Sequence, residues 1–96
     1  MAALSKVEIQ EKLTKMPGWS HAGKSLQKKF IFRSFVEAMA FVNKIAEAAE
    51  NAGHHPDITI SYNRVGINLS THSESGVTER DFDLANQIDR IRATMP

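Results

Sequence analysis

The chain has 96 residues, which predicts a single domain, residues 1–96, with a modest core. A formal net charge of +1 and scattered Lys and Arg residues argue against a surface for direct nucleic-acid binding. The absence of cysteine excludes disulfides and thiol nucleophiles, and no apolar run is long enough for a signal peptide or a membrane span, so we expect a cytoplasmic or nuclear protein.

The first third of the chain predicts a helix followed by a hairpin. Ser5 and Glu8 have the spacing of a capping box, which predicts a helix from about Lys6 to Lys15. Trp19–Ala22 and Ser25–Phe32 are typical of two strands joined by a short glycine-containing turn.

A long helix follows the first hairpin. Ser34 and Glu37 have the spacing of a second capping box, and Gly53 marks the end of the helical pattern. Between them, apolar residues recur at helical spacing and predict the buried face: Phe35, Ala38, Met39, Val42, Ile45, Ala46 and Ala49.

Apolar and polar residues then alternate with period two. This predicts a second hairpin, whose first strand begins at Asp57 and whose second strand ends at Leu69. With Asn63-Arg64 as a two-residue loop, Tyr62 faces Val65 and the apolar residues of both strands share one face of the sheet. This register makes Tyr62 a core residue.

A third capping box begins the last helix. Thr78 and Asp81 have its spacing, and the helix that follows presents an apolar face of Leu84, Ala85, Ile88 and Ile91. The predicted class is α+β, with a four-stranded antiparallel sheet, three helices on one face and the order α-β-β-α-β-β-α.

Histidines gather where the second hairpin begins and ends. Extending its register places His55 opposite His72, and His54 precedes His55 directly. Glu50 lies about one helical turn before His54, so a carboxylate approaches the same imidazoles. Histidine and carboxylate side chains together suit acid/base catalysis without a nucleophile.

Each candidate also has a structural interpretation. Glu50 can be a solvated helix residue, Asp81 can serve only the capping box, and His21 fits a surface position. Imidazole and carboxylate groups could also bind zinc, although adjacent residues of an extended segment, such as His54 and His55, point to opposite sides and are poor co-ligands.

The same residues form a familiar pattern with fixed spacings: Glu50, His54-His55-Pro56, Tyr62, His72 and Asp81. This pattern resembles the signature of the pterin-4a-carbinolamine dehydratases. The resemblance continues in Gly18-Trp19, Leu69-Ser70-Thr71-His72 and Thr78-Glu79-Arg80-Asp81, and so extends over nearly the whole chain. Two positions depart from it, Gly53 in place of an acidic residue and Ile58 in place of an aromatic one, and both leave the catalytic set intact.

The resemblance implies a hydro-lyase of tetrahydrobiopterin recycling that needs no cofactor and no metal. It would convert 4a-hydroxytetrahydropterin to quinonoid dihydropterin. Its catalytic residues would be His54, His55, His72 and Glu50, with Tyr62 and Asp81 in supporting roles. The substrate would contact His54, His55, Pro56, Thr71, His72, Ser73 and Glu74.

The resemblance also implies protein partners. Family members assemble as homodimers and homotetramers, and in animals one is a dimerisation cofactor and coactivator of a homeodomain transcription factor. The alternative function is therefore a protein-binding one that does not need the histidines. Loss of His54 and His72 would abolish the enzyme but leave such a scaffold intact.

Overall fold

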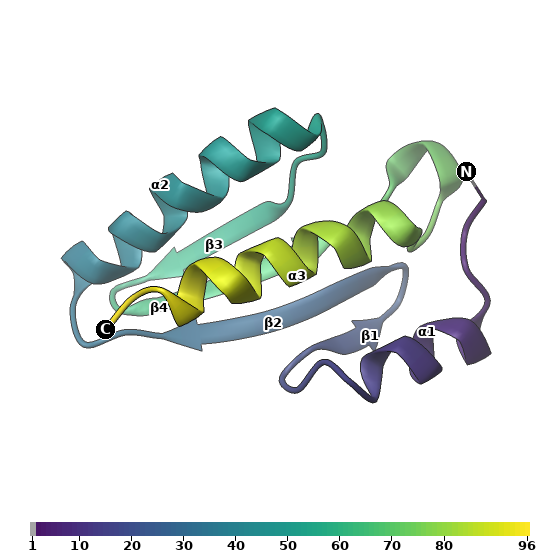
Figure 1. Ribbon diagram of the computed structural model, residues 1–96, viewed down its shortest axis with the longest axis horizontal. Helices are drawn as coiled ribbons and strands as arrows, with labels where there is room; N and C mark the ends of the chain where they lie inside the picture. The colour runs from purple at the N-terminus through teal and green to yellow at the C-terminus, as the bar shows by residue number, and fades with distance from the viewer. Residues whose placement is uncertain (1) are drawn as a thin grey trace.

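A four-stranded antiparallel sheet and three α-helices form the fold in the computed structural model of the chain, which describes residues 2–96 (Figure 1). The order and class predicted from the sequence are confirmed. The elements are α1 (Lys6–Leu13), β1 (Ser20–Ala22), β2 (Ser25–Ile31), α2 (Phe35–Ala52), β3 (Asp57–Ser61), β4 (Arg64–Leu69), the 3₁₀ helix η1 (His72–Glu74) and α3 (Glu79–Ala93).

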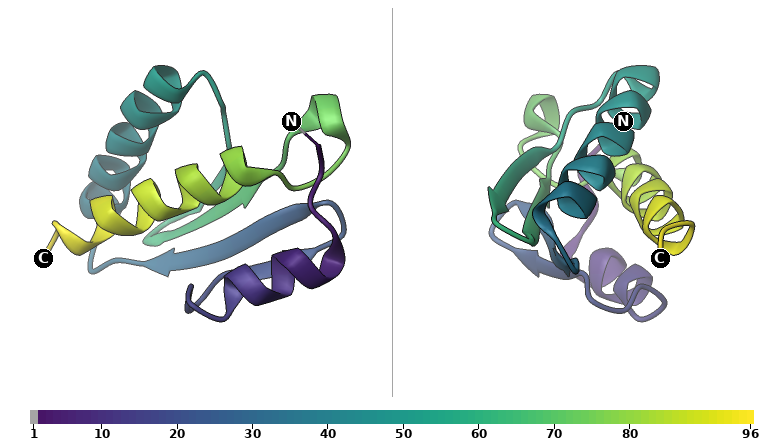
Figure 2. Two further views of the ribbon diagram at one scale, coloured as in Figure 1. Left: turned by 45° about the vertical axis from the view of Figure 1, so that its right-hand side comes forward. Right: turned by 90° about the vertical axis from the view of Figure 1, so that its left-hand side faces the viewer.

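The strands lie in the order β1-β2-β4-β3, and every neighbouring pair is antiparallel. Helices α2 and α3 pack side by side on one face of this sheet, as Figure 2 shows, and α1 lies beside β1. No helix among residues 2–96 combines the length and the apolar character needed to cross a bilayer.

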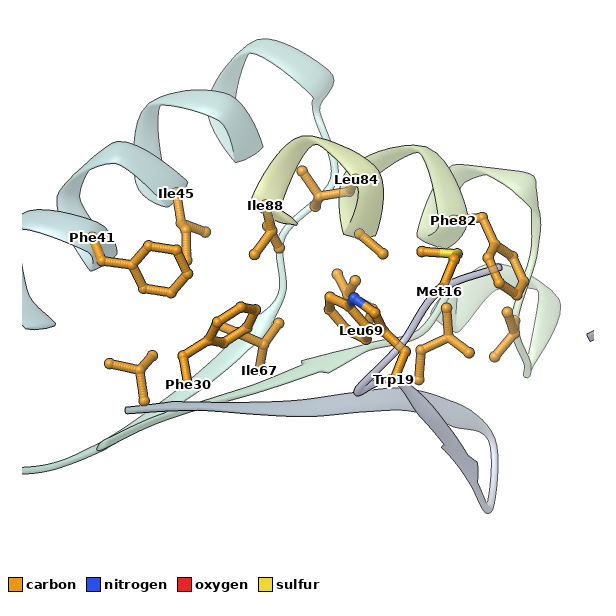
Figure 3. Packing of buried hydrophobic residues seen from close by; sticks show 14 of the residues in the cluster. Met16, Trp19, Phe30, Phe41, Ile45, Ile67, Leu69, Phe82, Leu84 and Ile88 are labelled. Carbon is orange, nitrogen blue, oxygen red and sulfur yellow. The ribbon is translucent and has the colours of Figure 1, made fainter. Parts of the chain in front are cut away.

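The core fills the space between the sheet and the two long helices (Figure 3). Phe41 of α2 is fully buried and lies 4.8 Å from Phe30 and 4.9 Å from Phe32, between ring centroids. The predicted face of α2 was partly wrong, because it omitted Phe41 and included Phe35 and Ala46, which are exposed. Helix periodicity locates an apolar stripe but not its edges.

The predicted register of the second hairpin was wrong by two residues. Ile60, not Tyr62, pairs with Val65, and the turn consists of Tyr62 and Asn63. Asn63 fixes the position of the turn through two hydrogen bonds to Phe32. Its side-chain amide donates to the Phe32 carbonyl at 2.8 Å, and its backbone carbonyl accepts from the Phe32 amide at 2.8 Å. A two-residue shift preserves strand parity, so the apolar residues still share one face.

Tyr62 is consequently not a core residue. It has a left-handed backbone with φ of 53° and an exposed fraction of 68%.

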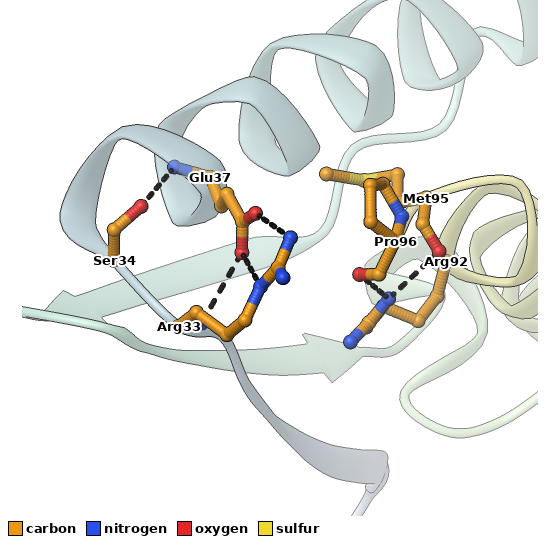
Figure 4. Close-up of polar contacts among 6 residues, drawn as sticks. All are labelled: Arg33, Ser34, Glu37, Arg92, Met95 and Pro96. Carbon is orange, nitrogen blue, oxygen red and sulfur yellow. Dashed lines mark hydrogen bonds and ion pairs between the residues drawn. The ribbon is translucent and has the colours of Figure 1, made fainter.

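Two of the three predicted capping boxes are confirmed, at Ser5 and at Thr78. The third is only half formed, because the Ser34 hydroxyl accepts from the Glu37 amide while the Glu37 carboxylate turns to Arg33 (Figure 4). The hydrogen bond from the Arg33 guanidinium lowers the pKa of Glu37 below its ordinary value. An ion pair with the preceding loop therefore replaces the reciprocal half of the cap.

Candidate active site

His54 lies directly after the C-terminal end of α2, where the chain turns towards the first residues of α3. Gly53 makes this turn in the left-handed region, with φ of 62°, and the His54 amide donates to the Ala49 carbonyl. The imidazole Nε2 then lies 2.5 Å from Oδ1 of Asp81. Both side chains are buried, with exposed fractions of 8% for His54 and zero for Asp81.

Asp81 connects three segments of the chain. Its Oδ2 accepts from the Thr78 amide at 2.9 Å, which is the capping contact, and from the Thr71 hydroxyl at 2.8 Å. The Thr71 and Thr78 hydroxyls lie 2.8 Å apart. Because the Thr71 proton goes to Asp81, the Thr78 hydroxyl donates to Thr71 and accepts from the Arg80 amide. Every polar atom of this buried network is thus satisfied.

The Asp81 contact also determines the tautomer of His54. An ionised carboxylate only accepts hydrogen bonds, so the proton lies on Nε2 of His54. Nδ1 is then the unprotonated nitrogen of the neutral ring. A carboxylate in this position orients the imidazole and stabilises the imidazolium that forms when Nδ1 is protonated.

His55 forms a second pair, at the surface. Its Nε2 contacts Oε2 of Glu50 in the last turn of α2, so the Glu50 carboxylate approaches one of the histidines as the sequence predicted. The side chains are 63% and 76% exposed. A pair this exposed contributes little to stability, but it holds one nitrogen of the His55 ring and leaves the other open to solvent.

His72 begins the short helix η1 and is exposed. The prediction that it lies opposite His55 was wrong, because β4 ends at Leu69 and a single bridge between Thr71 and Gly76 closes a tight loop instead. A small cavity of about 180 Å³ opens beside the ring, lined by Lys24, Ser70, Thr71, His72, Ser75 and Gly76.

Asp81 rather than the hairpin connects the two histidine segments. It binds His54 on one side and Thr71, the residue before His72, on the other. Figure 1 shows the end of α2, the start of α3 and η1 at the same end of the molecule.

The other predicted site residues differ in their placement. Pro56 is half-buried just before β3, and Ser73 and Glu74 are exposed in η1. Tyr62 follows the far end of β3, a whole strand away from His55. His21, expected at the surface, is half-buried in β1.

Among residues 2–96, no group of three or more His, Asp and Glu side chains is arranged to hold a metal ion.

Two contacts of this site were not foreseen from the sequence. One is the pairing of Asp81 with His54, and the other is a hydrogen bond of 2.8 Å from the Arg80 guanidinium to the Gly53 carbonyl. Each joins residues 27 positions apart. The capping pattern around Asp81 pointed only to its local role.

Residues 2–91 match the family model described as pterin 4 alpha carbinolamine dehydratase. The chain belongs to this family. A relative from the cyanobacterium Nostoc, whose name assigns pterin-4-alpha-carbinolamine dehydratase activity provisionally, is 53% identical over 88 residues, which is 92% of this chain and 95% of the relative. The resemblance stated from the histidine pattern is thus confirmed at the level of the family.

Solved structures of the family share the fold. A Brucella melitensis protein described as a transcriptional coactivator/pterin dehydratase superposes with a TM-score of 0.90 at 36% identity, covering 93% of this chain and 97% of that one. A pterin dehydratase-like protein described as a RuBisCO assembly factor of the alpha-carboxysome gives a TM-score of 0.64 at 26% identity, covering 76% and 84%. Proteins of this fold are therefore described both as dehydratases and as factors that act on other proteins.

Proposed function

We propose that this chain is a hydro-lyase that dehydrates 4a-hydroxytetrahydropterin to quinonoid dihydropterin in cytoplasmic tetrahydrobiopterin recycling. One observation carries the proposal: a buried His54–Asp81 pair is connected through Thr71 to the segment of His72, and His55 lies exposed beside it. Membership of the dehydratase family supports the substrate class.

The reaction requires two proton transfers and no redox step. The bond between the carbinolamine carbon and its hydroxyl oxygen breaks, and that oxygen leaves as water after receiving a proton. A ring nitrogen loses its proton, and the electrons of that N–H bond form the new carbon–nitrogen double bond. One acid and one base placed on the substrate therefore suffice.

The geometry supports a division of roles among the histidines. His54 exchanges a proton through Nδ1, because Asp81 holds Nε2 and stabilises the imidazolium. His72, exposed beside its small cavity, performs the complementary transfer. His55, held by Glu50, positions the substrate and stabilises charge on it. Pro56, Ser73 and Glu74 complete the substrate contacts.

The test is direct. The carbinolamine is generated with an aromatic amino acid hydroxylase, and its ultraviolet absorbance decay is followed with and without the protein. We expect wild type to accelerate the decay, and His72→Ala to reduce this acceleration by about 10²- to 10⁴-fold, the usual contribution of an acid or base. Exposure of His72 predicts unchanged folding by circular dichroism. A wild-type protein that leaves the spontaneous rate unchanged would refute the proposal.

A protein-binding role is the second candidate, and the description of the Brucella neighbour as a coactivator favours it. Such a role would place the protein in the nucleus as well, with a transcription factor as its partner. The double variant His54→Ala/His72→Ala separates the candidates. Retained capture of the partner with lost dehydration assigns binding to other surfaces.

We also propose that the chain forms homodimers or homotetramers. Strand β3 lies at the edge of the sheet, and apolar side chains near it are exposed, with exposed fractions of 41% for Ile60 and 68% for Tyr62. A strand edge with exposed apolar groups favours association with another chain. Light scattering of the purified protein at several concentrations measures the assembly state, and a mass of one chain at all of them would refute this.

A further inference from the structure

We propose that Arg80 is a positioning residue, which clamps the backbone corner that carries His54 and His55. The proposal rests on the proposed dehydratase function, because it assigns Arg80 a part in the same site. Its basis is the hydrogen bond of 2.8 Å that the Arg80 guanidinium donates to the carbonyl of Gly53.

The position of Arg80 is unfavourable for its own helix. It is the second residue of α3, whose N-terminal end carries the positive end of the helix dipole. Its neighbours Glu79 and Asp81 have the negative charge that suits this end. A cation between them is attracted by its acidic neighbours but opposed by the helix dipole, and the hydrogen bond that holds its guanidinium is a tertiary contact.

That contact is the end of another helix. Gly53 is the C-cap of α2, where unsatisfied carbonyls and the negative end of the dipole favour a cation. The last turn of α2 contains no basic residue of its own. Arg80 supplies the missing positive charge from α3 and satisfies the Gly53 carbonyl.

Two neighbouring contacts then join the two helix ends. The Gly53 carbonyl binds Arg80, and the side chain of the next residue, His54, binds the next residue of α3, Asp81. One contact holds the backbone and the other holds a ring. The His54 amide bond to Ala49 and the Glu50–His55 contact tie this corner to α2. Without Arg80, its backbone would be joined to α3 only through the His54 side chain, and the position of the exposed His55 relative to α3 would be less fixed.

The expected consequence is a loss of catalysis that exceeds the loss of stability. A displacement of about 1 Å at a reacting group can cost about 10²-fold in rate. We therefore expect Arg80→Ala to lower kcat/KM by about 10- to 100-fold, mainly through kcat. Arg80→Lys keeps the charge and a donor but not the reach of the guanidinium, so it should recover only part of the rate.

Two readouts distinguish a clamp from a general structural role. Guanidinium ion, added well below denaturing concentrations, should restore part of the activity of Arg80→Ala, because it can occupy the vacated position. Hydrogen exchange of the Gly53 and His54 amides, which donate to the Glu50 and Ala49 carbonyls, should accelerate in the same variant, while core amides of β4 stay protected. Arg90→Ala is the matched control, since Arg90 is an exposed arginine of α3 outside the site.

The outcomes separate this proposal from the dehydratase proposal. An active wild type with Arg80→Ala within about threefold of it would overturn the clamp and leave the enzyme intact. Lost activity with no guanidinium rescue and unchanged amide exchange would also overturn the clamp. If wild type is inactive as a dehydratase, the exchange experiment still decides: faster exchange only at the corner supports the clamp, and unchanged exchange refutes it.

Discussion

Replacing Asp81 with Asn tests the buried network most sharply, because the two side chains have the same shape. In the variant, the amide oxygen can still accept from Thr71 and from the Thr78 amide, as Oδ2 does now. The amide nitrogen then faces Nε2 of His54 and donates to it. His54 must move its proton to Nδ1, and this removes the base that we assign to it.

The contacts of Asp81 set the expected losses of stability and of activity in this variant. Three hydrogen bonds to a charged carboxylate become bonds to a neutral amide, at about 1 kcal/mol each. The buried amide costs less desolvation than a carboxylate, so the loss of folding free energy stays below about 3 kcal/mol. That limit corresponds to about 12 to 24 °C in Tm for a domain of this size. The dehydration rate should fall by about 10²- to 10⁴-fold.

Asp89→Asn is the matched control on the same helix. Asp89 accepts from the Trp19 indole at 2.9 Å and from Lys28 at 2.8 Å, and these contacts connect α3 to the first hairpin. The control should lose about 1 to 2 kcal/mol of stability, since its ion pair is partly exposed, and keep its activity within about threefold. Thermal unfolding by circular dichroism and the absorbance assay at 25 °C measure both quantities.

The comparison has a clear refuting result. If Asp81→Asn remains folded and dehydrates the carbinolamine within about threefold of wild type, the tautomer of His54 has no part in the reaction. Equal losses of activity in the two variants would likewise show that activity follows stability alone.

Two further predictions concern the fold. Phe41→Ala should lower the free energy of unfolding by about 3 to 5 kcal/mol in urea denaturation, because Phe41 is fully buried. Phe35→Ala on the same helix should lower it by less than about 1 kcal/mol, because Phe35 is exposed. Similar losses in the two variants would contradict the packing described for α2. The pKa of Glu37 lies below its ordinary value of 4.5 because Arg33 donates to its carboxylate, so this pair stabilises the fold above that pH and less as the pH falls through the lowered pKa. Glu37→Gln should therefore have a lower Tm than wild type at pH 7, with the difference shrinking in acid; a difference independent of pH would refute the ion pair's contribution.

Much of the fold follows from local patterns. The capping boxes at Ser5 and Thr78 begin helices where their spacing predicted, and the alternation after Asp57 produced two strands. These signals lie within a few residues of the structure they determine. The position of the turn at Tyr62 and Asn63 does not follow from local patterns, because Phe32, from another part of the chain, holds Asn63 in place.

The site, like the fold, has contacts that local sequence patterns predict and contacts that depend on the tertiary structure. The sequence by itself determined that Glu50, His54, His55 and His72 form a family motif, and it placed Asp81 in a capping box. Only the tertiary structure decided that Asp81 also binds His54, and that Arg80 holds Gly53. The physical reason is that a carboxylate has two oxygens: the capping pattern reveals the partner of one, and the partner of the other depends on which helix ends the folded sheet brings together.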